Sequence, residues 1–122
     1  MIKITDHKIS HTELLQLCRA HFDTMVKFVV DLDSHKVALG GEMYADAEAL
    51  LLQDGSDQSS LWGGNLYPWN DPEQRIEYTS FINIRPMDDN TSMEIQDDLI
   101  KKSVKTLTET CILGSDELLE GA

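Results

Sequence analysis

The stretch "MVKFVVDLDSHKVALGG", residues 25–41, predicts a β-hairpin. Every second residue from Val26 to Leu32 is apolar, which is the pattern of a strand with one buried face. The polar residues "DSH" at 33–35 favour a turn, and the returning strand is predicted to begin near Val37. The aspartates beside the turn need no function, because an Asp side chain readily accepts backbone N–H groups in turns. The sequence therefore predicts two neighbouring antiparallel strands.

Three helices are predicted around this hairpin. The first covers about residues 11–22, and Ser10 with Glu13 forms the S-x-x-E pattern of a capping box at its start. The second, "YADAEALLLQDG" at 44–55, is rich in good helix formers and has acids in its first turns. The third begins after Asp97, whose side chain is suited to cap a helix, and it carries an apolar stripe at helical spacing.

Strand patterns occur before, between and after these helices. Residues 2–5 fit a short edge strand, and "LWGGNLYP" at 61–68 fits another strand. The longest alternating pattern is "RIEYTSFINIRP" at 75–86, which predicts a strand ended by Pro86.

Helices separated by strand pairs are typical of an α+β fold. We therefore predict a mostly antiparallel sheet of four to five strands with about three helices packed on one face. The other face of the sheet would then be free for a ligand, a partner subunit or solvent. Residues 1–113 would form a single domain, and residues 114–122 would be an acidic, disordered tail.

Composition limits the classes of function. The chain has 122 residues, the size of one domain, and a net charge of −12. Such a charge repels phosphate backbones and anionic lipid surfaces, so neither nucleic-acid nor membrane binding is expected. The sequence shows no apolar leader and no long apolar run, which predicts a cytoplasmic protein. Cys18 and Cys111 are expected to be reduced core thiols, with a disulfide as the alternative.

One candidate metal site lies in an acidic segment. The common P-loop, dinucleotide-binding, nucleophile-elbow and zinc-protease motifs are absent from the sequence. If a helix begins near Glu42, then Glu42 and Asp46 share a helix face. Together with Glu48 they would offer carboxylate oxygens to Mg²⁺ or Mn²⁺. The alternative is a solvated helix N-terminus, where the helix dipole favours acids in any case.

A second candidate site is predicted to bind a small anion. Asn83 and Arg85 fall on the same face of the predicted strand 75–86, near its end. The planar guanidinium of Arg85 suits a carboxylate or phosphate, and the glycine-rich loop that contains Asn65 would lie beside it. The alternative is a structural salt bridge from Arg85 to one of three acids: Glu42, Glu77 or Glu94.

The distribution of charge and aromatic residues indicates partner contacts. Residues 37–74 contain seven acids and neither Lys nor Arg, so this segment forms a negative patch unless cations approach it from elsewhere. A basic partner protein would suit such a patch. Trp62 and Trp69 flank a glycine-rich turn, a composition found at dimer contacts and also in protein cores.

Three segments together resemble a family of small bacterial proteins carried only as a domain of unknown function. They are "MVKFVVDLDSHKVALGGEMYADAEALLLQDGS", "LWGGNLYP" and "YTSFINIRP…NTSMEIQD". The resemblance covers roughly residues 25–112. It implies one cytoplasmic bacterial domain, and it brings no activity, cofactor or catalytic residue.

The leading functional hypothesis is a small acidic module that binds a ligand or a protein, with a homodimer as one expected assembly. It rests on the absence of a nucleophile–base pair and on the polar residues Asn65, Asn83 and Arg85. One alternative is a divalent-metal-dependent enzyme that uses Glu42, Asp46 and Glu48. Another is an acidic regulatory partner of a basic protein.

Overall fold

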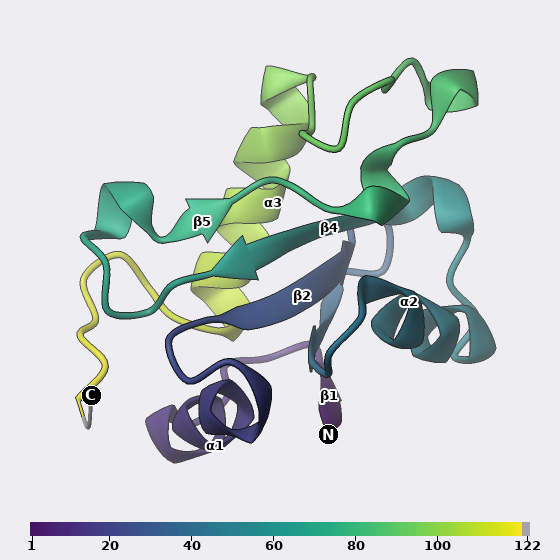
Figure 1. The fold of residues 1–122 in the computed structure, drawn as a ribbon. Helices are drawn as coiled ribbons and strands as arrows, with labels where there is room; N and C mark the ends of the chain where they lie inside the picture. Colours follow the sequence, from purple (N-terminus) through teal and green to yellow (C-terminus); the bar gives the residue numbers. More distant parts are fainter. Residues whose placement is uncertain (121–122) are drawn as a thin grey trace.

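The computed structural model describes residues 1–120, which form an antiparallel sheet of five strands. The strands are β1 (Ile2–Thr5), β2 (Val26–Asp31), β3 (Lys36–Gly40), β4 (Leu61–Leu66) and β5 (Ile76–Glu77). They lie in the order β1-β3-β2-β4-β5, with β2 at the centre (Figure 1). Val30 of β2 pairs with Val37 of β3, as the hairpin pattern predicts. The predicted α+β class and its antiparallel sheet are confirmed.

Three α-helices occur in the described part of the chain: α1 (His11–His21), α2 (Tyr44–Gln53) and α3 (Asp98–Cys111). Two of them begin at the predicted caps. The Ser10 hydroxyl accepts a hydrogen bond from the Glu13 N–H at 3.1 Å. The Asp97 carboxylate accepts one from the Leu99 N–H at 2.8 Å. Each bond satisfies a backbone donor that has no partner inside its helix. None of these helices is both long and apolar enough to cross a membrane.

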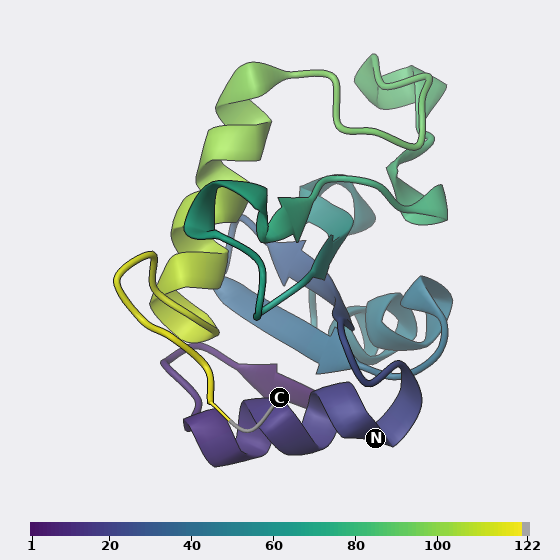
Figure 2. The same ribbon diagram turned by 60° about the vertical axis from the view of Figure 1, so that its left-hand side comes forward.

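The arrangement of the helices corrects one part of the predicted fold. α1 and α3 cover one face of the sheet, whereas α2 covers the opposite face (Figures 1 and 2). The reason lies in β2, whose apolar side chains point both ways. Phe28 packs with α1 and α3 in the larger core, while Val29 packs with Ala47 and Leu51 of α2 in a smaller one. A sheet that is apolar on both faces requires cover on both.

Both cysteines lie in the larger core. Cys18 and Cys111 are fully buried and no disulfide joins them, which confirms the expected free core thiols. Burial raises the pKa of the Cys18 thiol to about 11.

The β2–β3 turn is stabilised by Asp31, a buried carboxylate that is 1% exposed. Its Oδ1 accepts hydrogen bonds from the backbone N–H groups of Asp33 and Ser34 at 2.9 and 3.1 Å. Its Oδ2 accepts from the hydroxyls of Ser34 and Ser56. Burial alone would raise the pKa of Asp31, but these hydrogen bonds outweigh it and the pKa lies below its usual value. Asp31 therefore ties the hairpin turn to the segment after α2.

The predicted long strand at 75–86 is wrong. Only β5 belongs to the sheet, and the chain then continues through two 3₁₀ turns, at Phe81–Asn83 and Pro86–Asp88. A single bridge joins Thr79 to Glu94. β5 pairs only with Asn65 and Leu66 of β4. Farther along the edge of β4, the Asn83 side chain bonds to Gly63, so no strand forms there.

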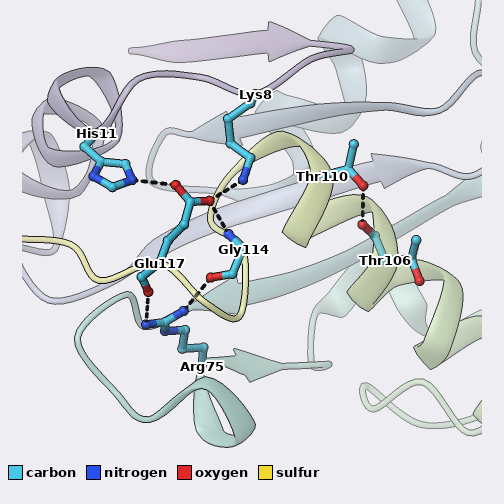
Figure 3. Close-up of polar contacts among 7 residues, drawn as sticks. All are labelled: Lys8, His11, Arg75, Thr106, Thr110, Gly114 and Glu117. Carbon is cyan, nitrogen blue, oxygen red and sulfur yellow. Dashed lines mark hydrogen bonds and ion pairs between the residues drawn. The ribbon is translucent and has the colours of Figure 1, made fainter.

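The C-terminal segment also differs from its prediction as a disordered tail. Its described part, residues 114–120, packs against the domain, and Leu119 is only 6% exposed. Arg75 is buried, and its Nη1 and Nη2 donate to the carbonyls of Gly114 and Glu117 at 3.0 and 2.6 Å (Figure 3). Gly121 and Ala122, the remainder of the predicted tail, lie outside the described residues.

The side chain of Glu117 completes this attachment. It accepts hydrogen bonds from Lys8 Nζ, from the Gly114 N–H at 2.7 Å and from His11 Nε2 at 2.8 Å (Figure 3). The bond from Lys8 is the main reason that the pKa of Glu117 falls to about 2, followed by the bonds from Gly114 and His11. The C-terminal segment is thus held to Lys8 and His11 near the start of the chain and to Arg75, the residue before β5.

Candidate functional site

A cleft of about 500 Å³ opens between α3 and the end of the sheet where β1 ends and the β2–β3 turn lies. This volume is typical of sites for small molecules. Leu32 and Leu107 supply the apolar part of its lining. The other lining residues are polar and exposed: Asp6, His35, Lys102, Ser103, Thr106 and Thr110. An apolar base with a polar rim is the usual make-up of a binding site for a small organic ligand.

The wall of the cleft formed by α3 offers several hydrogen-bonding groups. Thr106 Oγ1 donates to the carbonyl of Lys102 at 3.0 Å. Thr110 Oγ1 donates to the carbonyl of Thr106 at 2.8 Å (Figure 3). Both threonine protons are therefore engaged by the helix, and the oxygens keep lone pairs for a ligand donor. The hydroxyl of Ser103 makes no hydrogen bond within residues 1–120, so both its proton and its lone pairs are available.

The opposite wall comes from two turns. His35 has a left-handed backbone with φ of 58°, a conformation that the β2–β3 turn imposes and that His tolerates better than most residues. Asp6 lies just after β1, and His7 Nδ1 is 2.9 Å from its Oδ1. This hydrogen bond is the largest cause of the lowered pKa of Asp6. The cleft thus carries one carboxylate, one imidazole and one ammonium group.

Lys102 is the distinctive residue of the cleft. Ion pairs with acids engage several of the basic residues: Lys3, Lys8, Lys36, Lys101 and Arg85. Lys102 has no such partner in residues 1–120. Its three N–H donors are consequently free for an anionic ligand. Lys105, one helical turn away, is also unpaired in the described chain, but it does not line this cleft.

The three residues predicted to bind an anion do not form one site. Asn83 is fully buried and bonds to both backbone groups of Gly63. Arg85 bonds to the carbonyl of Leu61 at 2.5 Å. Leu61, Gly63 and Asn65 are alternate residues of β4. Arg85 and Asn83 contact the first two and Asn65 is the third, so the three predicted residues are spread over roughly 13 Å of the strand.

The contacts of Arg85 fit the alternative prediction, a structural salt bridge, better than they fit an anion-binding site. Its Nε is 2.9 Å from Asp88 Oδ2, and its guanidinium carbon is 4.1 Å from the centre of the Trp62 ring. The partner is Asp88, which is not one of the three predicted acids. The Arg85 side chain is only 10% exposed, so its fork is not presented to solvent.

Asn65 belongs to a separate polar network on the face covered by α2. Its Oδ1 accepts from the Tyr44 hydroxyl, and its Nδ2 donates to Glu77 Oε1 at 2.7 Å. Lys27 Nζ lies 4.5 Å from the centre of the Tyr44 ring. Burial, opposed by the hydrogen bond to Asn65, raises the pKa of Tyr44 to about 12. This network satisfies its own members and joins α2 to the sheet.

The three residues predicted as metal ligands also do not lie together in one cluster. α2 begins after Met43, so Glu42 lies outside the helix and 3.6 Å from His21 Nδ1. Asp46 is exposed in the first turn of the helix. Glu48 has one shielded oxygen without a hydrogen-bond partner in the described residues. No three His, Cys, Asp or Glu side chains in residues 1–120 are grouped to hold a metal ion. Binding of Mg²⁺ or Mn²⁺ stays a prediction.

Sequence reasoning missed the α3 cleft. Its only local signal is the spacing of Lys102, Thr106 and Thr110, four residues apart on one helix face. A solvated helix face has the same pattern. What turns this face into a cleft is the β2–β3 turn and the end of β1, which are distant in the sequence.

Comparison with known proteins identifies one relationship. Residues 3–111 match the model of a family described as a protein of unknown function, DUF5674. No curated protein and no solved structure matches the chain.

Proposed function

Because the chain belongs to the DUF5674 family, whose function is unknown, we propose a function from its own cleft. The chain is a binding module for a small organic molecule that carries a carboxylate or phosphate group. The observation that supports this most directly is Lys102, an ammonium without an acidic partner in residues 1–120, at the rim of a cleft of about 500 Å³.

Each part of the cleft suits one part of such a ligand. Lys102 donates to the anionic group, and the Ser103 hydroxyl adds a second donor beside it. Leu32 and Leu107 contact the apolar body of the ligand. The lone pairs of Thr106 and Thr110 accept from any hydroxyl or amine that the ligand carries.

The net charge of −12 does not oppose this proposal. Repulsion between the whole protein and an anion is screened over about 8 Å at physiological salt. Close to the cleft, Lys102 and Lys105 of α3 have no acidic partner in residues 1–120, so their positive charges are not offset by an ion pair. The overall charge therefore slows the association of an anionic ligand, whereas the contact with Lys102 slows its dissociation.

Thermal unfolding with added ligand tests the proposal, because a ligand that binds only the native state raises the melting temperature. Phenyl phosphate and benzoate probe the two anionic groups on the same apolar ring, and inorganic phosphate probes the anion alone. We expect one of the aromatic anions to raise Tm at millimolar concentration, and inorganic phosphate to raise it less.

Two variants provide the matched comparison. Lys102→Ala should abolish the shift, whereas Lys105→Ala removes the same charge from the next turn of α3 and should keep it. Equal shifts in the two variants, or no shift with any of the three anions, would contradict a ligand site at Lys102.

A further inference from the structure

The loop between β5 and α3 presents three large apolar side chains to solvent. Phe81 is 71% exposed, Ile84 is 44% exposed and Met87 is 98% exposed. They recur every three residues, at or next to the 3₁₀ turns Phe81–Asn83 and Pro86–Asp88. Three exposed apolar side chains within seven residues of one loop suit a contact surface for another molecule.

The loop is held in place from its inner side. The Asn90 amide donates to the carbonyls of Asn83 and Ser92, each at 2.8 Å. Arg85 and Asn90 form two backbone hydrogen bonds with each other, at 2.7 and 3.1 Å. Ile82 packs against the smaller core. Since the inward residues anchor the loop, Phe81 and Met87 cannot turn inward without breaking these bonds. The backbone that carries them is held in place, which lowers the cost of ordering the loop on binding.

The surroundings of these side chains are acidic. In both views this loop lies on the same side of the molecule as α2, and the first 3₁₀ turn contacts α2 (Figures 1 and 2). Residues 42–57 and 81–89 together contain seven acids and a single cation, Arg85, which is 10% exposed and paired with Asp88. Lys36 neutralises only Asp54. We call these two segments the acidic docking face.

We propose that the acidic docking face binds an amphipathic, Lys- or Arg-rich helix of another protein, with Phe81 and Met87 as its apolar anchors. Charge complementarity selects this occupant, because basic side chains around an apolar stripe would meet the uncompensated acids. A second copy of the chain would place the same acids against one another, which is repulsive. The face uses different elements from the α3 cleft, so the two proposals are independent.

A synthetic amphipathic helical peptide made of Leu and Lys serves as the probe, with fluorescence anisotropy as the measurement on the full chain. We expect saturable binding that weakens at high salt. Phe81→Ser and Met87→Ser should each weaken binding by about tenfold or more, as truncation of interface anchors does. Leu118→Ser is the matched control, because Leu118 is 75% exposed and lies in the C-terminal segment.

Three outcomes would overturn the proposal. The first is an absence of peptide binding by the wild-type chain. The second is equal loss of binding in Leu118→Ser and in the two loop variants, or no loss in any of them. The third is a concentration-dependent dimer that Met87→Ser dissociates, which would assign the face to a second copy. Urea unfolding of each variant verifies that the fold is kept.

Discussion

The side-chain amide of Asn83 makes both hydrogen bonds that a neighbouring strand would make with Gly63. Its Oδ1 accepts from the Gly63 N–H at 2.8 Å, and its Nδ2 donates to the Gly63 carbonyl at 2.9 Å. The same Nδ2 also donates to the carbonyl of Met93 at 3.0 Å. A side chain thus closes the edge of β4 beyond β5, where unpaired backbone groups would otherwise be buried or available to another chain.

Asn83→Ala should lower the free energy of unfolding by about 2–4 kcal/mol, because it leaves the buried N–H and carbonyl of Gly63 and the part-buried carbonyl of Met93 without this partner. Urea unfolding at neutral pH measures the change. Asn70→Ala is the control, since the exposed side-chain amide of Asn70 bonds, within residues 1–120, only to the carbonyl of Gln74 at 3.2 Å. A loss for Asn83→Ala as small as the control's would show that the amide does not substitute for a strand.

Gly63→Ala should be destabilising for a steric reason. A Cβ at this position would lie 2.6 Å from Ser80 Oγ and 2.7 Å from Ser80 Cβ, and Ser80 is buried. We expect a loss of about 1–3 kcal/mol, which is typical of overpacking. Adding Ser80→Gly should restore part of it, so a double-mutant cycle should give a favourable coupling energy. Additive losses would mean that the strain lies elsewhere.

Glu117 should make stability depend on pH in acid. Its pKa is about 2 in the folded protein, against a usual value of 4.5, so the unfolded chain takes up this proton first. The stabilisation is therefore complete above about pH 4.5 and is lost as the pH falls toward 2. Because the side chain is 29% exposed, we expect only about 1–2 kcal/mol.

Glu117→Gln isolates this contribution from the other carboxylates. The difference in unfolding free energy between wild type and variant should be largest at pH 7 and should shrink toward pH 3. Glu94→Gln is the control, because Glu94 forms an exposed ion pair with Lys101 and is itself 61% exposed. A difference for Glu117→Gln that does not vary with pH would contradict the role of its ionised form.

The buried thiols should be unreactive in the native protein. Cys18 is fully buried and its pKa is raised to about 11, so little thiolate exists at pH 8. A chromogenic disulfide reagent should react with Cys18 and Cys111 slowly in buffer and rapidly in urea. Rapid labelling of the native chain would show that the larger core opens easily.

The parts of the fold that the sequence predicts are those encoded locally. Alternation at 26–32 and the side chains of Ser10 and Asp97 act within a few residues, and each appears in the structure as predicted. The position of α2 depends on the second apolar face of the hairpin, visible in the run "FVV" at 28–30.

The remaining errors come from long-range contacts. The pattern at 75–86 fits a strand, but Asn83 supplies the bonds to Gly63 from a 3₁₀ turn instead. The C-terminal segment appears as a free tail until Arg75 and Lys8 approach it from far along the chain. The α3 cleft needs three distant segments, so Lys102 alone gives no sign of it.

The most direct measurement of the proposed function is a ¹H–¹⁵N NMR titration of the chain with phenyl phosphate and, separately, benzoate. We predict that at least one of them shifts backbone amides mainly at Lys102–Thr110 and at the β2–β3 turn near His35, that Lys102→Ala loses these shifts and that Lys105→Ala keeps them. Shifts centred on Asn65 and Arg85 instead, or unchanged spectra at millimolar concentrations of both anions, would contradict a ligand site in the α3 cleft.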